Sequence, residues 1–513
     1  MSVFGEPLAA RETRLCSMTP DLDPELCYRA FLAKDARFDG RIFVCVTSTG
    51  IYCRPICPAR VPKKANCRFV SSAAAAEAAG FRSCLRCRPE TAPGTPAWAG
   101  TQASVARALR LIEEGALDED GVEDLAGRVG LGARQLRRLF IAHLGATPQA
   151  VAANRRLLAA KQLISETDMS FADIAFAAGF QSLRRFNDAV RASYGVAPTA
   201  LRRGAARENA GDAITLRLGY RPPFDWARML GYLSFRAIPG VEEISGERYR
   251  RSFRLGAARG LLAVTTGKKA NTLDISIRAD GSARANASPP IRQIAARARR
   301  IFDLDAEPTA IAAAFAEDPV LAPRLALVGG IRVPGAFDGF ELGVRAILGQ
   351  QVSVKGATTL AGRVVKRCGE ARARPDGAIT HYFPSAEALA DGDLSGLGLT
   401  GGRISALKNF AHAVARGDVD FSPAASLEEK IEELCAVPGI GPWTAHYIAL
   451  RAVGEPDAFP AADLGLRKAA GNGEPISTKA MEDMAQSWRP WRGYAALLLW
   501  MQPDTGISAV AAD

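Results

Sequence analysis

The sequence predicts a multidomain α+β protein, and three observations lead to that class. A chain of 513 residues, 48% of them hydrophobic, is long enough for three or four domains that each bury a core. A Pro/Gly-rich stretch, TAPGTPAWAG, follows a cysteine-rich beginning. Beyond residue 206, strand-like alternation gives way to apolar residues at helical spacing. We therefore expect four domains, at 1–92, 101–205, 212–290 and 291–505.

Net charge and hydropathy indicate which partners the protein can have. The chain has 65 Lys and Arg against 54 Asp and Glu, and the resulting net charge of +11 permits a polyanionic partner without requiring one. Apolar runs are too short to span a bilayer, and Arg11 and Arg14 precede no apolar block. We therefore expect a cytoplasmic protein without a membrane partner.

The first ninety residues hold most of the cysteines. Leu22–Phe31 has the spacing of a short amphipathic helix and Ile42–Val46 alternates as a strand, so a small α/β domain is expected. Eight of the ten cysteines precede residue 90, and four of them form two closely spaced pairs. Two thiolate pairs supply the four tetrahedral ligands that zinc prefers, which predicts one Zn²⁺ site. The expected ligands are Cys53, Cys57, Cys84 and Cys87.

Residues 101–205 contain an internal repeat. Leu125-Ala126 with Gly130-Leu131 recurs 49 residues later as Ile174-Ala175 with Gly179-Phe180, in the pattern of a helix-turn-helix. A basic amphipathic helix follows each copy, at 133–143 and 182–194, and a long helix at 148–164 joins them. An all-α double helix-turn-helix domain is expected; the alternative is a helical bundle that does not bind DNA. The candidate base-reading side chains are Arg134, Gln135, Arg138, Gln181, Arg184 and Arg185.

The remaining residues predict two further domains. Three segments alternate as strands, at 214–218, 259–265 and 272–277, and the segment 229–240 reads as a helix, so 212–290 is expected to form a small α+β lobe. From Ile291 to the segment 494–501, apolar residues recur at helical spacing. We expect 291–505 to be a helical bundle.

One stretch in this bundle carries a distinctive motif. Gly439 and Gly441 flank an apolar residue between two helices, 431–437 and one starting near Pro442. Such a hairpin can aim backbone N–H groups at a phosphate, although an ordinary corner between helices is the alternative. Trp443 and Tyr447 then lie on one helical face, and Asp463 follows a Pro-containing loop.

This arrangement resembles the helix-hairpin-helix glycosylases, and the segments 344–354 (VRAILGQQVSV) and 488–492 (WRPWR) resemble the AlkA-type 3-methyladenine DNA glycosylases over about 214–503. The resemblance implies a DNA-3-methyladenine glycosylase II that hydrolyses the N-glycosidic bond of N-alkylated purines. It implies that Asp463 is the catalytic carboxylate and that Trp443, Tyr447 and Trp500 form the base pocket. It also places Gln351 where relatives insert an apolar side chain into the gap that the flipped base leaves in the duplex. Trp443 stands where lyase-competent relatives have a lysine, so base removal without strand cleavage is expected. No cysteine follows Cys435, which excludes the iron-sulfur cluster of some relatives.

A second resemblance covers the beginning of the chain. TGIYCRPICPAR with GFRSCLRC is similar to the N-terminal domain of the Ada adaptive-response regulators, and residues 101–205 resemble AraC-type DNA-binding domains. The resemblance implies that Cys53 accepts a methyl group from a methylphosphotriester while zinc is held by all four cysteines. It also implies phosphate contacts by Arg60, Arg82 and Arg86; solvated surface arginines are the alternative. The chain has no Pro-Cys-His-Arg motif, so repair of alkylated guanine oxygen is not expected.

Together these features predict a fused alkylation-repair enzyme and transcriptional regulator. The expected partners are alkylated double-stranded DNA and promoter double-stranded DNA, and RNA polymerase is a candidate. The protein is expected to be associated with the nucleoid. A monomer is expected, because its two helix-turn-helix units reach successive major grooves without dimerisation. The alternative is a transcription activator whose glycosylase lobe is inactive.

Overall fold

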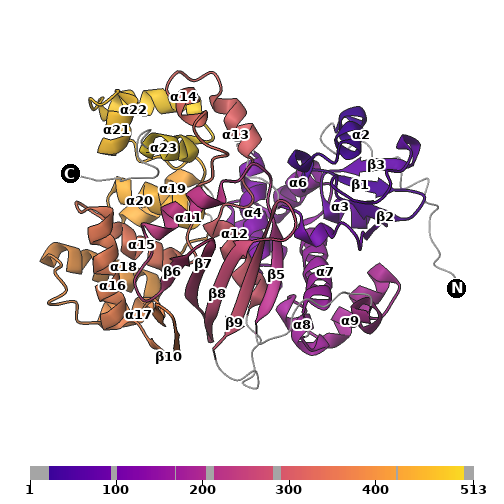
Figure 1. Cartoon of the computed structure of the whole chain (residues 1–513), viewed down its shortest axis with the longest axis horizontal. Helices are drawn as coiled ribbons and strands as arrows, with labels where there is room; N and C mark the ends of the chain where they lie inside the picture. The colour runs from indigo at the N-terminus through magenta and orange to yellow at the C-terminus, as the bar shows by residue number, and fades with distance from the viewer. Residues whose placement is uncertain are drawn as a thin grey trace. The chain divides into compact units, whose positions relative to one another are not determined.

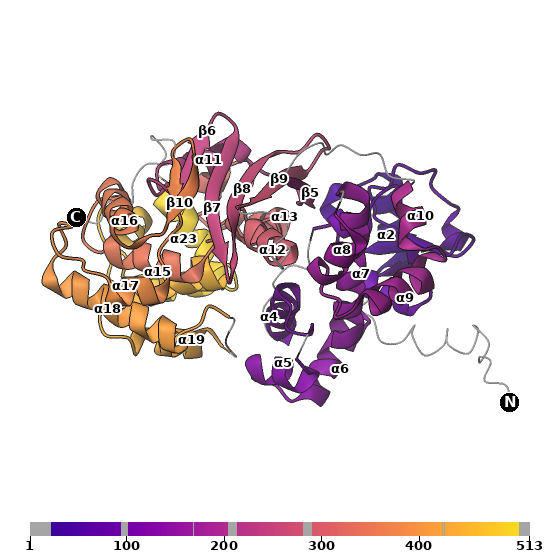
Figure 2. The same cartoon turned by 90° about the horizontal axis from the view of Figure 1, so that it is seen from below.

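The computed structural model describes residues 22–93, 101–203 without 119 and 168, 213–280, and 290–501 without 423 and 425. The chain divides into two units, 1–208 and 209–513 (Figures 1 and 2). Each unit contains two of the four predicted domains. Among the described residues, no helix has the length and apolar character needed to cross a membrane.

The first unit begins with a four-stranded sheet of order β3-β1-β2-β4. Its elements are α2 (Pro24–Leu32), β1 (Phe43–Val46), β2 (Ile51–Cys53), β3 (Cys67–Val70), α3 (Ala73–Ala78) and β4 (Arg82–Ser83). Alternate residues of β1 face opposite sides, so Val44 packs with Phe31 of α2 while Phe43 and Cys45 pack with Ala76 of α3. The small α/β domain expected from the sequence is therefore a sheet with a helix on each face.

Helices make up the rest of the first unit. They are α4 (Thr101–Glu114), α5 (Val122–Arg128), α6 (Ala133–Leu144), α7 (Pro148–Glu166), α8 (Phe171–Ala177), α9 (Leu183–Tyr194) and α10 (Pro198–Arg203). The pairs α5–α6 and α8–α9 are the two predicted helix-turn-helix units. The long helix α7 joins them; Thr147 caps its first turn and Pro148 occupies its first position, where a missing N–H costs nothing.

The second unit opens with a five-stranded antiparallel sheet of order β5-β9-β8-β7-β6. Its elements are β5 (Ile214–Gly219), α11 (Trp226–Ser234), β6 (Glu242–Ser245), β7 (Arg248–Leu255), β8 (Ala258–Thr266) and β9 (Thr272–Ala279). The prediction of three strands was incomplete, because β6 and β7 also belong to the sheet. The predicted helix 229–240 was misplaced: Asp225 caps α11 by accepting the Arg228 N–H, and the helix ends at Ser234.

The helical bundle follows the sheet. Its elements are α12 (Ile291–Ile301), α13 (Pro308–Phe315), α14 (Ala322–Leu325), α15 (Gly339–Leu348), α16 (Val354–Cys368), β10 (Ala371–Asp376), β11 (Ile379–His381), α17 (Ala386–Asp391), α18 (Gly401–Arg416), α19 (Leu427–Cys435), α20 (Pro442–Ile448), α21 (Leu464–Ala470), α22 (Thr478–Ala485) and α23 (Arg492–Trp500). One apolar core lies among α15 to α20 and another among α13, α21, α22 and α23. Ala445 and Ile448 enter the first core, while Ala449 and Leu450, which follow α20, enter the second. The hairpin helix is therefore fixed by two cores.

Candidate catalytic and metal sites

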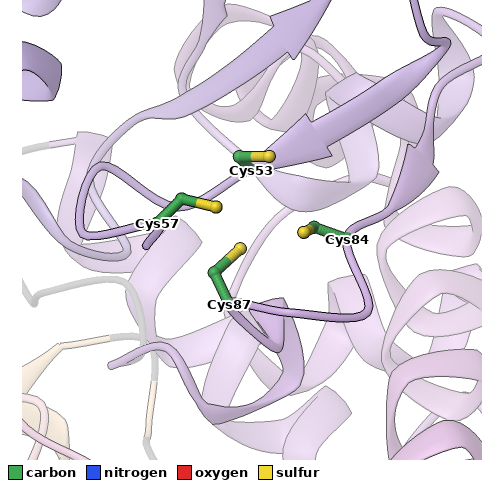
Figure 3. A group of neighbouring side chains, drawn as sticks. All are labelled: Cys53, Cys57, Cys84 and Cys87. Atoms are coloured by element: carbon green, nitrogen blue, oxygen red, sulfur yellow. The ribbon is translucent and has the colours of Figure 1, made fainter. Parts of the chain in front are cut away.

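Four cysteine side chains converge beside the first sheet, with their sulfur atoms pointing toward one another (Figure 3). Cys53 ends β2 and Cys57 lies in the turn after it, whereas Cys84 and Cys87 follow β4. Because β2 and β4 pair in parallel, both segments leave the sheet at the same edge. All four residues are buried, and their sulfurs lie within 4.8 Å of one another. Tetrahedral zinc with Zn–S bonds of about 2.3 Å separates its sulfurs by about 3.8 Å, so the cluster fits one Zn²⁺ ion.

The four sulfurs differ in the hydrogen bonds that they accept. Three receive a backbone N–H: Cys87 from Arg54 at 3.3 Å, Cys84 from Arg86 at 3.3 Å, and Cys57 from Ala59. Among the described residues, no backbone N–H donates to Cys53 Sγ. Hydrogen bonds to a thiolate stabilise its charge and lower its reactivity. The sulfur of Cys53 is therefore the least stabilised of the four.

Buried ion pairs join the cysteine loops to α7. The side chain of Lys161 is 3% exposed, and its Nζ donates to Glu90 Oε2 at 2.7 Å and to the backbone oxygen of Cys84 at 2.8 Å. Nearby, Arg88 Nη2 lies 2.6 Å from Glu166 Oε1. No local sequence pattern marks these residues, because the two members of each pair are more than seventy positions apart. The zinc site thus rests directly on the helix that joins the two helix-turn-helix units.

The side chains predicted to contact DNA in the first unit lie at its surface. The exposed ones are Arg60 and Arg86 near the cysteines, Arg134, Gln135 and Arg138 on α6, and Arg184 and Arg185 on α9; Arg82 is half-buried. Gln181 is exposed but already engaged, because its Nε2 donates to the backbone oxygen of Asp118 at 2.6 Å and its Oε1 accepts from Arg185 at 2.9 Å. Reading a base with Gln181 would require breaking these two bonds.

In the second unit, the hairpin between α19 and α20 requires glycine at one position and leaves space at the other. Gly439 has φ +99°, and a Cβ there would lie 2.4 Å from the Cβ of Ala406. Gly441 is the N-cap of α20 and is exposed, and a Cβ added there would meet nothing within 4 Å, so its backbone is accessible to a large partner. Gln350 Nε2 donates to the Gly439 oxygen at 3.2 Å and ties the turn after α15 to the hairpin. Gln351 beside it is exposed, with a left-handed φ of +56°.

Asp463 is the N-cap of α21, and three N–H groups hold its carboxylate. Oδ1 accepts from the backbone N–H of Leu466 at 2.8 Å and from Trp500 Nε1 at 3.1 Å. Oδ2 accepts from Trp443 Nε1 at 2.7 Å. Asp463 is only 6% exposed. Donors from α20, α21 and α23 therefore fix this carboxylate in one orientation, and the two tryptophans predicted as pocket walls also serve to position it.

The same tryptophans line a cavity of about 150 Å³. The rings of Trp443 and Tyr447 are stacked, with centroids 5.3 Å apart and planes at 10°, and Trp500 meets Tyr447 edge-on at 6.3 Å. Met229 and Tyr232 of α11 contribute to the lining from the sheet lobe. The structure therefore brings the three predicted aromatic side chains together beside Asp463, with a further aromatic residue that the sequence analysis did not select.

A buried arginine at this cavity was also missed. Arg451 lies four residues after Tyr447, in a π-helical turn (Ala449–Val453), and its Nη1 donates to the Tyr447 hydroxyl. Burial works to raise the pKa of Tyr447, but the positive charges of Arg451, Arg236 and Arg345 outweigh it and hold this pKa below its usual range. The spacing of four residues was the available signal, since it places both side chains on one helical face.

Four segments of the chain match known protein families. Residues 26–90 match the metal binding domain of Ada, and 125–204 match a helix-turn-helix domain. Residues 215–338 match the AlkA N-terminal domain, and 344–492 match the HhH-GPD superfamily of base excision DNA repair proteins.

Relatives with known names match both the whole chain and its parts. The probable bifunctional transcriptional activator/DNA repair enzyme AlkA of Mycobacterium tuberculosis is 43% identical over 484 residues, which are 93% of this chain and 96% of the relative. DNA-3-methyladenine glycosylase 2 of Escherichia coli is 34% identical over 56% of this chain and 98% of its own length. The Escherichia coli bifunctional transcriptional activator/DNA repair enzyme Ada is 40% identical over 24% of this chain and 33% of its own length. With its zinc-binding cysteines, paired helix-turn-helix units and helix-hairpin-helix glycosylase fold, this chain belongs to the family of bifunctional AlkA-type transcriptional activators and DNA repair enzymes.

Proposed function

We propose that the second unit excises N-alkylated purines from double-stranded DNA by hydrolysing the N-glycosidic bond, with Asp463 as the catalytic carboxylate. The observation that carries this assignment is the pair of indole N–H bonds from Trp443 and Trp500 to Asp463, since both tryptophans also line the cavity. A carboxylate fixed beside an aromatic pocket suits a reaction in which a flipped base leaves and positive charge develops on the sugar.

The steps follow from these residues. The damaged nucleotide rotates out of the duplex, and its purine enters the cavity against Trp443, Tyr447 and Trp500. A cationic alkylpurine is attracted to the electron-rich aromatic faces and is already a good leaving group. As it departs with the bonding electrons, Asp463 stabilises the positive charge at the sugar carbon C1′ and guides the attacking water.

Base removal without strand cleavage completes this proposal. Relatives that also cleave the strand use a lysine in the hairpin to form a Schiff base, and Trp443 occupies that position. Its side chain donates to Asp463 and offers no nucleophilic amine. Gly439 and Gly441 of the hairpin are the proposed phosphate anchors, and Gln351 is the proposed residue at the gap left by the flipped base. The left-handed backbone and exposure of Gln351 support that placement.

For the first unit we propose methyl transfer to Cys53. Bound zinc keeps the cysteine sulfurs deprotonated at neutral pH. Cys53 Sγ attacks the methyl carbon of a methylphosphotriester; the sulfur–carbon bond forms while the methyl oxygen–carbon bond breaks, and the phosphodiester anion leaves. The lack of a backbone N–H donor at Cys53 supports this choice among the four sulfurs. The product is a thioether, so the transfer occurs once per molecule.

Methylation couples repair to DNA binding through charge. With zinc held by the four cysteines the site would carry a formal charge of −2, and a methyl group on Cys53 would reduce this to −1, which would weaken repulsion from DNA phosphates near Arg60, Arg82 and Arg86. We propose that α6 and α9 of one monomer then enter successive major grooves of promoter DNA, with exposed arginines suited to guanine. RNA polymerase is the proposed partner at the promoter, and the nucleoid is the proposed place of action.

One experiment tests both activities. The full-length, zinc-loaded protein is incubated with duplex DNA carrying radiolabelled methyl groups, and the label is followed into free base and into protein. We expect free methylpurine together with about one methyl group per protein molecule. Label on protein alone would favour an activator with an inactive glycosylase lobe. Label in neither fraction would refute both activities.

A further inference from the structure

Arg451 is a buried cation at the wall of the base cavity. It is 5% exposed, yet it is among the residues that line the cavity with Trp443, Tyr447 and Trp500. Its backbone forms part of the π-helical turn after α20, and such turns occur often at functional sites. The guanidinium group is therefore placed where a flipped base would meet it.

The hydrogen bonds of Arg451 leave some of its donors unused. Nε donates to the backbone oxygen of Pro334 at 2.7 Å, and Nη1 donates to the Tyr447 hydroxyl. Nη2 donates to none of the described residues, and it is not enclosed by them, so its N–H groups are open to the cavity.

Within the described part of the chain, no carboxylate lies within 4.0 Å of its guanidinium group; the charge of Glu242, which Arg345 already pairs, acts on it from farther away. The neighbouring arginines have a carboxylate within that distance: Arg251 lies 2.5 Å from Glu341 and Arg345 lies 3.0 Å from Glu242. Arg451 instead lies over the rings of Tyr232 and Tyr447, 5.2 Å from each centroid. Burying an unpaired charge is costly, so a guanidinium with spare donors in a cavity is well suited to a ligand that brings a hydrogen-bond acceptor.

We propose that Arg451 is a specificity-determining residue that reads the carbonyl oxygen of guanine-type lesions in the flipped state. A guanidinium group donates readily to O6 of a guanine-type base. In 7-methylguanine O6 is the remaining acceptor on this edge, because N7 carries the methyl group. An adenine-type lesion presents an amino group at position 6, which is itself a donor and cannot accept from Arg451 there. This inference rests on the proposed glycosylase activity and adds to it a preference between two classes of purine.

A ratio measured in one tube tests the proposal. Duplex DNA methylated by a simple alkylating agent carries both 7-methylguanine and 3-methyladenine, and chromatography separates the two released bases. The full-length parent protein is compared with R451M, with R451K, and with R372M. Arg372 is a buried arginine on β10, paired with Asp280 at 2.7 Å and not part of the cavity wall, so R372M controls for the general loss of a buried guanidinium.

We expect R451M to lower the ratio of 7-methylguanine to 3-methyladenine release rates by about 10- to 100-fold, the effect of losing a hydrogen bond from a charged donor. R372M should leave the ratio unchanged. Because both rates come from one sample, the fraction of folded protein cancels. If R451M releases neither base, R451K provides the measurement. A lysine keeps the charge but cannot bind Pro334 and Tyr447 and also reach the base as the forked guanidinium does, so the ratio should fall about 10-fold.

The proposal would be overturned if R451M, or R451K when R451M is inactive, releases the two bases in the same ratio as the parent protein. This includes the case in which the release rates of 7-methylguanine and 3-methyladenine fall by the same factor. Failure of the proposed glycosylase itself is distinct, because then the parent protein would release neither base.

Discussion

Replacing Asp463 by Asn removes one charge from the proposed catalytic site and keeps the shape of the side chain. Asp463 is buried, so the effective dielectric constant around it is about 20 rather than that of water. At about 4 Å from the positive sugar carbon, one negative charge then contributes about 4 kcal/mol. That energy corresponds to a factor of about 1,000 in rate. We expect D463N to release methylpurines about 1,000-fold more slowly in single-turnover assays.

A second effect of this substitution has to be separated from the loss of charge. The cap of α21 survives, because an Asn oxygen still accepts from the Leu466 N–H. The amide nitrogen, however, replaces the oxygen that accepts from Trp443 Nε1, so two donors face each other at a cost of about 1–3 kcal/mol. The double variant W443F/D463N removes that conflict and restores stability. Thermal unfolding should therefore show D463N as the less stable of the two.

The rates then decide between charge and geometry. If the charge of Asp463 drives catalysis, W443F/D463N stays as slow as D463N although its stability recovers, and W443F alone remains much faster than both. Recovery of base release in the double variant would refute the reasoning, because the defect of D463N would then come from the clash of donors. Release by D463N within about 10-fold of the parent, at equal folded fraction, would also refute it.

Three further predictions concern other parts of the chain. C53A should gain no methyl group from methylated DNA in intact-protein mass spectrometry, whereas the parent gains one. K161M removes the shorter of the two buried ion pairs of Glu90 and leaves only that with Arg88 at 3.3 Å, which should cost about 3 kcal/mol and lower the melting temperature of the first unit by roughly 10 °C. K64M, at an exposed pair, should shift it by no more than about 2 °C in the same calorimetric scan. Burial, and then the charge of Arg492, lower the pKa of His446 from 6.5 to about 4. The unfolded chain therefore binds this proton first, and the second unit should lose up to about 3 kcal/mol as pH falls from 6.5 to 4 in urea titrations; H446Q should flatten that dependence.

Much of the architecture could be predicted because its signals are local. Cysteine spacing marked the zinc cluster, and a 49-residue repeat marked the two helix-turn-helix units. The hairpin glycine at 439 has a reason that the structure makes explicit, namely a left-handed φ and contact with Ala406. The glycosylase resemblance suggested one site for Asp463 and three aromatic side chains. In the structure the three aromatic side chains line one cavity and two of them, Trp443 and Trp500, donate to Asp463, a contact that nothing in the sequence indicated.

The features that were missed depend on contacts between distant residues. The strand β7 reads RYRRSFRL, and its arginines hide the alternation that normally marks a strand. Arg251 is buried there because Glu341, ninety residues later, and Glu242 on β6 both form ion pairs with it. Arg451 could not be identified from the sequence, because an arginine in a helical segment usually lies at the surface. Long-range ion pairs and cavity walls leave no periodic trace in a sequence.

The buried contacts of Lys161 and Arg88 limit how this protein can be recombined with others. The Pro/Gly-rich linker after the zinc domain suggests that this domain could be transferred to other regulators by gene fusion. Yet a zinc domain moved alone would take Glu90 and Arg88 with it and leave their partners, Lys161 and Glu166, behind on α7. Arg88 and Glu90 would keep only their bond to each other, at 3.3 Å, and Lys161 and Glu166 would lose these contacts. A working chimera therefore has to exchange both domains together or carry α7 along with the cysteines.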